Sequence, residues 1–193
     1  MTALSLPSAA GTSVGPAGTT ENEADPVDVL LRTWDGTSPT GVVDQALVHK
    51  RDRINVVLSR VAPVPSLDHS FVAQVHVDQS NRFFFDHPLD HAPGLLLIEA
   101  ARQFGVLVAH EHYGVPMDYS FVLRSFHIQF DRYAELDAPI FIVGRTADRK
   151  EGRGGLSRMT FAGEFVQRGR RIGTMTGAWR MVSPAVLARL RTR

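Results

Sequence analysis

The sequence predicts an α+β protein in which an antiparallel β-sheet wraps around one long buried helix. The helix is expected over residues 95–113, because from residue 95 to residue 109 the only charged or strongly polar side chains are Glu99, Arg102 and Gln103. A helix that is apolar on nearly every side has to be buried. Extended segments precede this helix, and a further group follows it. Such a segregated order favours an antiparallel sheet over alternating α/β units.

Local patterns predict the remaining elements. Residues 26–34 (PVDVLLRTW) indicate a short helix or an anchoring segment, and residues 70–78 (SFVAQVHVD) alternate as a strand does. Pro93 and Gly94 suit the first turn of the long helix, and Gly114 suits its end. Ser183 is expected to cap a short helix over residues 185–191. The other strands are expected at residues 54–61, 82–85, 121–130, 140–145, 157–167 and 171–182, with hairpin turns at 151–155 and 168–170.

Composition divides the chain into four parts. Residues 1–25 are small, proline-containing and acidic, with almost nothing large to bury, so a disordered tail is expected. Residues 26–44 form a linker or short anchoring segment. Residues 45–182 carry the alternating and apolar patterns of one compact domain, and residues 183–193 form the short C-terminal helix.

Composition also excludes several classes of chemistry. The 193 residues contain no cysteine, which rules out disulfides, thiolate metal sites and cysteine nucleophiles. No apolar run reaches the roughly 18 residues of a membrane span, and the first residues have no secretory pattern. We therefore expect a cytoplasmic protein that does not bind a membrane.

Charge is distributed unevenly along the chain. Residues 145–193 carry 12 Lys and Arg against 3 Asp and Glu, whereas residues 1–144 carry 9 against 17. The basic end is either a solvated face or a docking surface for an acidic partner. Nucleic acid is not expected, because aromatic residues are not interleaved with these arginines.

The polar residues of the segment DHPLDHAPGLLLIEAARQ, residues 86–103, are the candidate functional groups. His87 and His91 each follow an aspartate, and a histidine oriented by a carboxylate can act as a base near neutral pH. One of the two could instead brace the loop. No metal site is expected, because two spaced histidines with carboxylates are weak evidence for one. The free N–H groups near Gly94 and Leu95 can bind an oxyanion or simply begin the helix.

Glu99 is the best catalytic candidate within the helix. A buried carboxylate is costly unless it has a partner or a function. The alternative is a structural ion pair with Arg102, three residues further on. Gln103 could orient Glu99 or a substrate oxygen, or it could hold the backbone of a neighbouring loop.

The residues around this segment resemble a known family. The phrases ALVHK (46–50), HPLDHAPGLLLIEAARQ (87–103) and GVPMDYSFVL (114–123) resemble the AfsA-like hotdog family of A-factor biosynthesis. The related β-hydroxyacyl-carrier-protein dehydratases carry His, Pro-Gly and Glu-x-x-x-Gln, matched here by His87, Pro93-Gly94, Glu99 and Gln103. The spacing from His87 to Glu99 is shorter than in the dehydratases. The resemblance implies a single hotdog fold, with the sheet wrapped around the helix.

The resemblance also implies a function. It indicates transfer of a β-ketoacyl group from an acyl carrier protein to a hydroxyl of a dihydroxyacetone-phosphate-type acceptor, as in butyrolactone or furan signal biosynthesis. Dehydration or isomerisation of a β-hydroxyacyl thioester is the second reading, and a non-catalytic acyl-binding or scaffold module is the third. No cofactor is implied beyond the carrier's phosphopantetheine arm. Family members usually have two hotdog units with sites between them, so a single unit implies a homodimer.

The residue assignments follow from the resemblance and the pattern together. His87, Glu99 and Gln103 are the expected catalytic residues, and the expected substrate-binding residues are His91, Gly94, Leu95 and Arg102. Carrier proteins are acidic, so basic residues at the two hairpin turns are expected to dock the carrier. These are Arg149, Lys150, Arg153, Arg168, Arg170 and Arg171.

Overall fold

The computed structural model describes residues 25–35, 41–152 and 155–192. Most of the tail expected over residues 1–25, and Arg153, therefore lie outside the described residues. The helices are α1 (Pro26–Asp35), η1 (Ala46–Val48), η2 (Arg53–Asn55), α2 (Gly94–Tyr113) and α3 (Pro184–Arg191). The strands are β1 (Leu58–Pro63), β2 (Ser70–Val75), β3 (Ser120–Phe130), β4 (Ile140–Gly152), β5 (Gly155–Gln167) and β6 (Arg170–Val182). No helix in these ranges is long and apolar enough to cross a membrane.

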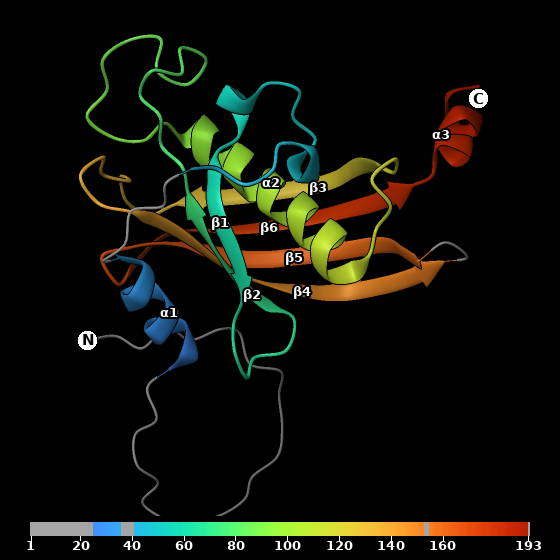
Figure 1. Ribbon diagram of the computed structural model, residues 1–193, viewed down its shortest axis with the longest axis horizontal. Helices are drawn as coiled ribbons and strands as arrows, with labels where there is room; N and C mark the ends of the chain where they lie inside the picture. The colour runs from blue at the N-terminus through green and yellow to red at the C-terminus, as the bar shows by residue number, and fades with distance from the viewer. Residues whose placement is uncertain (1–24, 36–40, 153–154, 193) are drawn as a thin grey trace, which may run out of the picture.

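The strands form one antiparallel sheet in the order β1-β2-β4-β5-β6-β3. The sheet curves around α2, which lies against its inner face (Figure 1). This arrangement confirms the expected fold class. β3 pairs only with β6 and forms one edge of the sheet.

The apolar sequence of α2 places it at the centre of the main core. Leu96, Phe104 and Val108 are almost completely buried. The Phe104 ring meets the Phe161 ring of β5 edge-on, with ring centroids 4.8 Å apart. Gly144 makes room for this pair, because a Cβ atom there would lie 2.2 Å from the Phe161 ring. The helix ends at Gly114, which adopts a left-handed conformation with φ of 62° and donates its N–H to Ala109.

α1 covers part of the outer face of the sheet. Val27, Leu31 and Trp34 pack against a cluster that includes Val72 and Val143. Since α2 covers the other face, every residue of β2 is buried, although its sequence alternates. The helical reading of residues 26–34 is thus confirmed, and this helix anchors the chain to the sheet.

Two expected strands are absent from the structure or begin later than expected. Residues 82–85 do not form a strand but a turn, in which the Asn81 carbonyl accepts hydrogen bonds from the amides of Phe84 and Phe85. The Asn81 side chain also accepts from the Phe83 amide and donates to the Ile54 carbonyl, so local side-chain bonds replace a strand ladder. The strand expected over residues 54–61 begins only at Leu58. Before it, the Val57 amide and the Asn55 carbonyl are hydrogen-bonded to the Gln103 side chain of α2 and not to another strand.

The C-terminal half agrees with expectation in its order and type of elements. β4 extends to Gly152, beyond the expected end at residue 145, because it pairs with β5 along its whole length. The turn at residues 168–169 joins β5 and β6, and both of its residues have positive φ. Ser183 caps α3 by accepting from the Val186 amide at 3.4 Å.

Candidate functional site

Glu99 lies in the first third of α2 and is held by three donors. Arg102 donates to both carboxylate oxygens at 2.8 Å, and Gln103 Nε2 donates at 2.9 Å. Lys50 Nζ lies 2.7 Å from Oε1. We call Lys50, Glu99, Arg102 and Gln103 the Glu99 cluster. Its two cations and one carboxylate leave one net positive charge.

The cluster keeps Glu99 ionised. Burial alone favours the neutral acid, but the hydrogen bonds and charge of Arg102, with the bonds from Lys50 and Gln103, outweigh it. Together they hold the pKa of Glu99 below its ordinary value of 4.5. Glu99 is therefore a carboxylate at neutral pH, suited to accept hydrogen bonds or a proton and not to donate one.

Gln103 joins the cluster to the segment before β1. Its side chain is fully buried, and its Oε1 accepts from the Val57 amide at 3.0 Å. Its Nε2 donates to the Asn55 carbonyl at 2.7 Å as well as to Glu99. Both contacts considered for Gln103 from the sequence thus occur, and its assignment as a catalytic residue stays a prediction.

Lys50 is the member of the cluster that sequence reasoning missed. It lies in the phrase ALVHK (46–50), which indicates the family but does not by itself indicate a site residue. Lys50 and Glu99 are far apart in the sequence, so no helical or strand spacing predicts that they lie together. Lys50 follows η1, and Arg102 links η1 to α2 because its Nη2 donates to the Val48 carbonyl at 3.1 Å.

The two histidines of the entry loop are each bonded to the aspartate before them. His87 Nδ1 lies 2.5 Å from Asp86, and His91 Nδ1 lies 2.6 Å from Asp90. An aspartate on Nδ1 leaves Nε2 as the nitrogen able to exchange a proton with a substrate. Among the described residues, neither histidine bonds to the Glu99 cluster.

His87 and His91 differ in how firmly the fold holds them. The His87 side chain is 65% exposed, whereas that of His91 is 32% exposed. His91 forms an isolated β-bridge with Glu135, and its ring lies 4.8 Å from the Tyr133 ring. His91 is thus held more firmly than His87, and the assignments of His87 as catalytic and of His91 as substrate-binding stay predictions.

The N-terminus of α2 offers two N–H groups. The amides of Leu96 and Leu97 bond to the Pro93 carbonyl at 3.0 and 3.3 Å. Those of Gly94 and Leu95 precede the first intrahelical bond and make no backbone hydrogen bond within the described ranges. Gly94 also permits close packing, since a Cβ atom there would lie 3.1 Å from the Phe130 ring. Leu95 is 51% exposed beside it.

A second histidine pair lies near the cluster. His110 Nδ1 contacts the Val115 carbonyl at 2.7 Å, so it must carry the proton. His110 Nε2 then accepts from His49 Nε2 at 2.9 Å. Burial, which is the largest cause, and the charge of Arg102 lower the pKa of His49. Within the described ranges, no three His, Asp or Glu side chains are placed to hold a metal ion.

The basic residues of the two hairpin turns do not form one patch. The β4–β5 and β5–β6 turns lie at opposite ends of β5, about 40 Å apart at 3.3 Å per residue. Arg168, Arg170 and Arg171 lie at the end near the start of α2. Arg168 pairs with Asp137 at 2.5 Å, and Arg171 lies 3.4 Å from Asp131 and 3.7 Å from Glu164. The structure therefore divides the basic residues expected to dock the carrier into two groups at opposite ends of β5, and their docking role stays a prediction.

Arg149 and Lys150 lie at the other end, beside the last residue of α2. The Arg149 guanidinium lies 5.5 Å from the centre of the Tyr113 ring and donates to Thr146 at 3.4 Å. These residues are remote from His87 and the α2 N-terminus. Of the three hairpin arginines near the start of α2, Arg170 is the one for which no ion pair occurs within the described ranges.

The fold defines the class of protein, which is a hotdog protein. The dehydratase heterocomplex ApeI:P from Xenorhabdus doucetiae aligns with a TM-score of 0.56 and 16% identity, over 79% of this chain and 98% of that chain. A mutant thioesterase from Pseudomonas aeruginosa aligns with a TM-score of 0.51 and 16% identity, over 74% of this chain and 95% of that chain. At such identities the likeness shows the fold alone.

Within this class, the model of the A-factor biosynthesis hotdog domain, AfsA, matches residues 33–183. The chain therefore belongs to the AfsA family. Two relatives are named 2-oxo-3-(phosphooxy)propyl 3-oxoalkanoate synthase. The one from Streptomyces virginiae is 41% identical over 69 residues, which are 36% of this chain and 21% of the relative. The one from Streptomyces griseus is 39% identical over 71 residues, 37% of this chain and 21% of the relative. The match thus spans about one fifth of these curated relatives.

Proposed function

We propose that the chain transfers a 3-oxoacyl group from an acyl-carrier-protein thioester to a hydroxyl of a phosphorylated three-carbon acceptor such as dihydroxyacetone phosphate. The observation that carries this proposal is the Glu99 cluster, in which an ionised carboxylate is held among donors with one net positive charge. The names of the relatives, which are synthases of a phosphooxypropyl 3-oxoalkanoate, support it. A cytoplasmic site of action is part of the proposal.

The protonation state of Glu99 favours acyl transfer over dehydration. In a dehydratase the acidic residue protonates the departing hydroxyl, so its pKa has to lie near or above the working pH. The pKa of Glu99 is lowered instead, and Lys50 and Arg102 stabilise its charge. Acyl transfer requires a base and a group that stabilises an oxyanion, and neither requirement conflicts with an ionised Glu99.

Each step has a group to perform it. The acceptor oxygen attacks the thioester carbon while its proton passes to Nε2 of His87, which Asp86 orients. The N–H groups of Gly94 and Leu95 stabilise the oxyanion that forms. When the carbon–sulfur bond breaks, His87 returns the proton to the carrier's thiolate. The excess positive charge of the Glu99 cluster suits the acceptor's phosphate.

The test is to supply a 3-oxoacyl thioester with dihydroxyacetone phosphate or with unphosphorylated dihydroxyacetone, and to measure ester formation by mass spectrometry. We expect the phosphorylated acceptor to react at least tenfold faster, which corresponds to about 1.4 kcal/mol of preference. Lys50→Met should reduce this preference by raising KM for the phosphorylated acceptor. Equal rates with the two acceptors would contradict the proposal.

Docking of the carrier protein is proposed at the end of the sheet near the start of α2. Arg170→Glu is expected to slow reaction with a carrier-bound substrate several-fold at low salt, because exposed charges act mainly on encounter rates. Arg32→Glu, an equal change on the exposed face of α1, is the control and should have no effect. A short thioester without the carrier should react equally with all three proteins. A slowing by Arg170→Glu that is the same at low and at high salt would contradict this docking site.

We also propose that the chain pairs with a second copy along β3. Apolar side chains remain exposed on or beside this edge strand, including Leu123 at 49%, Phe130 at 42% and Tyr133 at 71%. An exposed edge with apolar side chains is a template for pairing. We expect light scattering at micromolar concentration to give twice the mass of 21.3 kDa. A single-chain mass under those conditions would contradict the proposal.

A further inference from the structure

Three basic side chains lie in one row across the C-terminal strands. Lys150 of β4 is the register partner of Arg158 of β5, and Arg158 is the register partner of Arg180 of β6. Their neighbours Met159 and Trp179 are buried in the α2 core, so the row points to the opposite, outer face. All three side chains are exposed. We call them the basic row.

The basic row is unfavourable for the fold taken by itself. Like charges directly opposite one another on neighbouring strands repel. Within the described ranges, no carboxylate forms an ion pair with any of the three. The adjacent row of the same face is small and uncharged, and consists of Ala147, Thr160, Ala178 and Ser125. No ion pair within the described ranges therefore offsets the repulsion.

The row is remote from the candidate site. Phe130, which packs on Gly94, is the register partner of Gly173, and Arg180 lies about 23 Å further along β6 at 3.3 Å per residue. The sheet itself separates the row from α2. The row therefore has no part in binding the acyl group or the acceptor at the α2 N-terminus.

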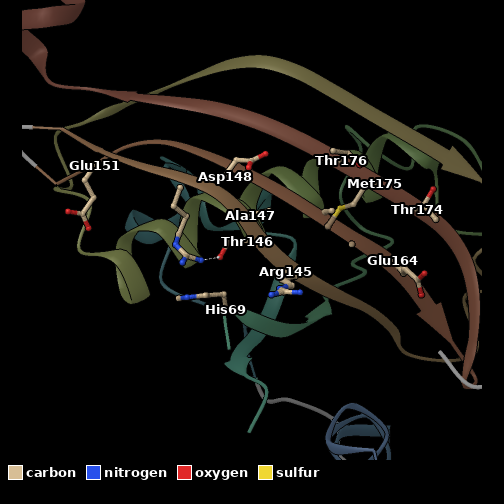
Figure 2. Close-up of a pocket in the computed structure, with 13 residues that line it drawn as sticks. His69, Arg145, Thr146, Ala147, Asp148, Glu151, Glu164, Thr174, Met175 and Thr176 are labelled. Carbon is tan, nitrogen blue, oxygen red and sulfur yellow. Dashed lines mark hydrogen bonds between the residues drawn. The ribbon is translucent and has the colours of Figure 1, made fainter. Parts of the chain in front are cut away.

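A pocket of about 760 Å³ lies near the basic row and is shown in Figure 2. Arg145 and Arg149 line it, but so do the carboxylates of Asp148, Glu151 and Glu164. Its charge is mixed, so it does not select an anion.

We propose that the basic row docks an acidic helix of a partner protein. Neighbouring strands lie about 4.8 Å apart, and residues three or four apart on a helix have Cβ atoms about 5–6 Å apart. A helix lying across β4, β5 and β6 can therefore present one carboxylate to each cation of the row. Nucleic acid fits less well, because neither the row nor its small-residue neighbour contains an aromatic side chain for base stacking.

The test measures binding of a fluorescent helical peptide of about 20 residues to the full chain by anisotropy. One peptide carries glutamate at positions three or four apart along one face, and its isomer has the same composition with the glutamates spread around the helix. Arg158→Glu combined with Arg180→Glu removes the row. Arg32→Glu combined with Arg53→Glu makes the same charge change at exposed sites elsewhere. Thermal melting and turnover of a short thioester verify that each variant remains folded.

We expect the one-faced peptide to bind more tightly than its isomer, and to bind more weakly as salt rises. The row variant should lose binding by about tenfold or more, and the control variant should not. An equal loss in both variants, or equal binding of the two peptides, would contradict the proposal and show that the row is an ordinary solvent-exposed surface. Tighter binding of an oligothymidine or of phosphatidylserine-containing vesicles, lost in the row variant, would overturn the proposal in favour of a nucleic acid or a membrane.

Discussion

Glu99→Gln is expected to lower turnover about 100-fold, because the carboxylate holds Lys50 and Arg102 where the proposed function has them bind the acceptor's phosphate, and a misplacement of about 1 Å can cost that much. Glutamine keeps the shape of the side chain, but it leaves Lys50 and Arg102 without their shared counter-ion. Removing one partner of a fully buried ion pair costs about 3–5 kcal/mol. Because the Glu99 side chain is 17% exposed and its partners more so, we expect a loss of about 1–2 kcal/mol in the free energy of unfolding.

The pH dependence of this loss gives a second check. A carboxyl whose pKa is lowered on folding stabilises the protein above its unfolded pKa, and that contribution disappears as the pH falls through the folded pKa. The stability difference between the natural protein and Glu99→Gln should therefore be constant near neutral pH and shrink below pH 4.5. Denaturant titrations at several pH values measure it. The control is Glu111→Gln, on an exposed position of the same helix. A difference that grows in acid would show that Glu99 is not ionised as described.

Gln103→Leu is expected to have the largest effect on stability. Leucine fills the buried space but leaves the Val57 amide and the Asn55 carbonyl without their partner. Each unsatisfied buried group costs about 1–3 kcal/mol, so the expected loss for the two groups is about 2–6 kcal/mol. For a domain of this size that corresponds to a fall in Tm of roughly 4–24 °C.

Differential scanning calorimetry measures this change, with Gln79→Leu in the exposed loop after β2 as the control. Gln103→Glu gives a further comparison, because a carboxylate can still accept from Val57 but cannot donate to Asn55 and would repel Glu99. The Gln103→Glu protein should therefore also be less stable than the natural protein. A Tm within about 2 °C of the natural protein for Gln103→Leu would show that the segment before β1 does not depend on this side chain.

The fold could be predicted because its main determinants are local. A helix as apolar as α2 has to be buried, and the helix ends at Gly114 as the sequence predicts. The alternation of residues 70–75 likewise identifies β2. The errors occur where one side chain replaces a backbone ladder. The Gln103 side chain hydrogen-bonds the Asn55 carbonyl and the Val57 amide. The Asn81 side chain accepts from the Phe83 amide in the turn where a strand was expected.

The candidate site was predicted only in part, for a similar reason. Glu99, Arg102 and Gln103 follow a helical spacing, so their proximity could be inferred from the sequence. Lys50 reaches Glu99 through the tertiary fold, which no local spacing reveals. The basic hairpin residues form two separate groups, because antiparallel strands place successive turns at opposite ends of the sheet.

The central claim is that an ionised Glu99 serves acyl transfer and not dehydration. The most direct measurement is to incubate the protein with carriers bearing a 3-oxoacyl or a 3-hydroxyacyl group, with and without dihydroxyacetone phosphate, and to record the intact carrier masses. The account predicts that the 3-oxoacyl carrier loses its acyl group only when the acceptor is present, and that the 3-hydroxyacyl carrier never loses water. Loss of one water from the 3-hydroxyacyl carrier, with no acceptor-dependent loss from the 3-oxoacyl carrier, would contradict it.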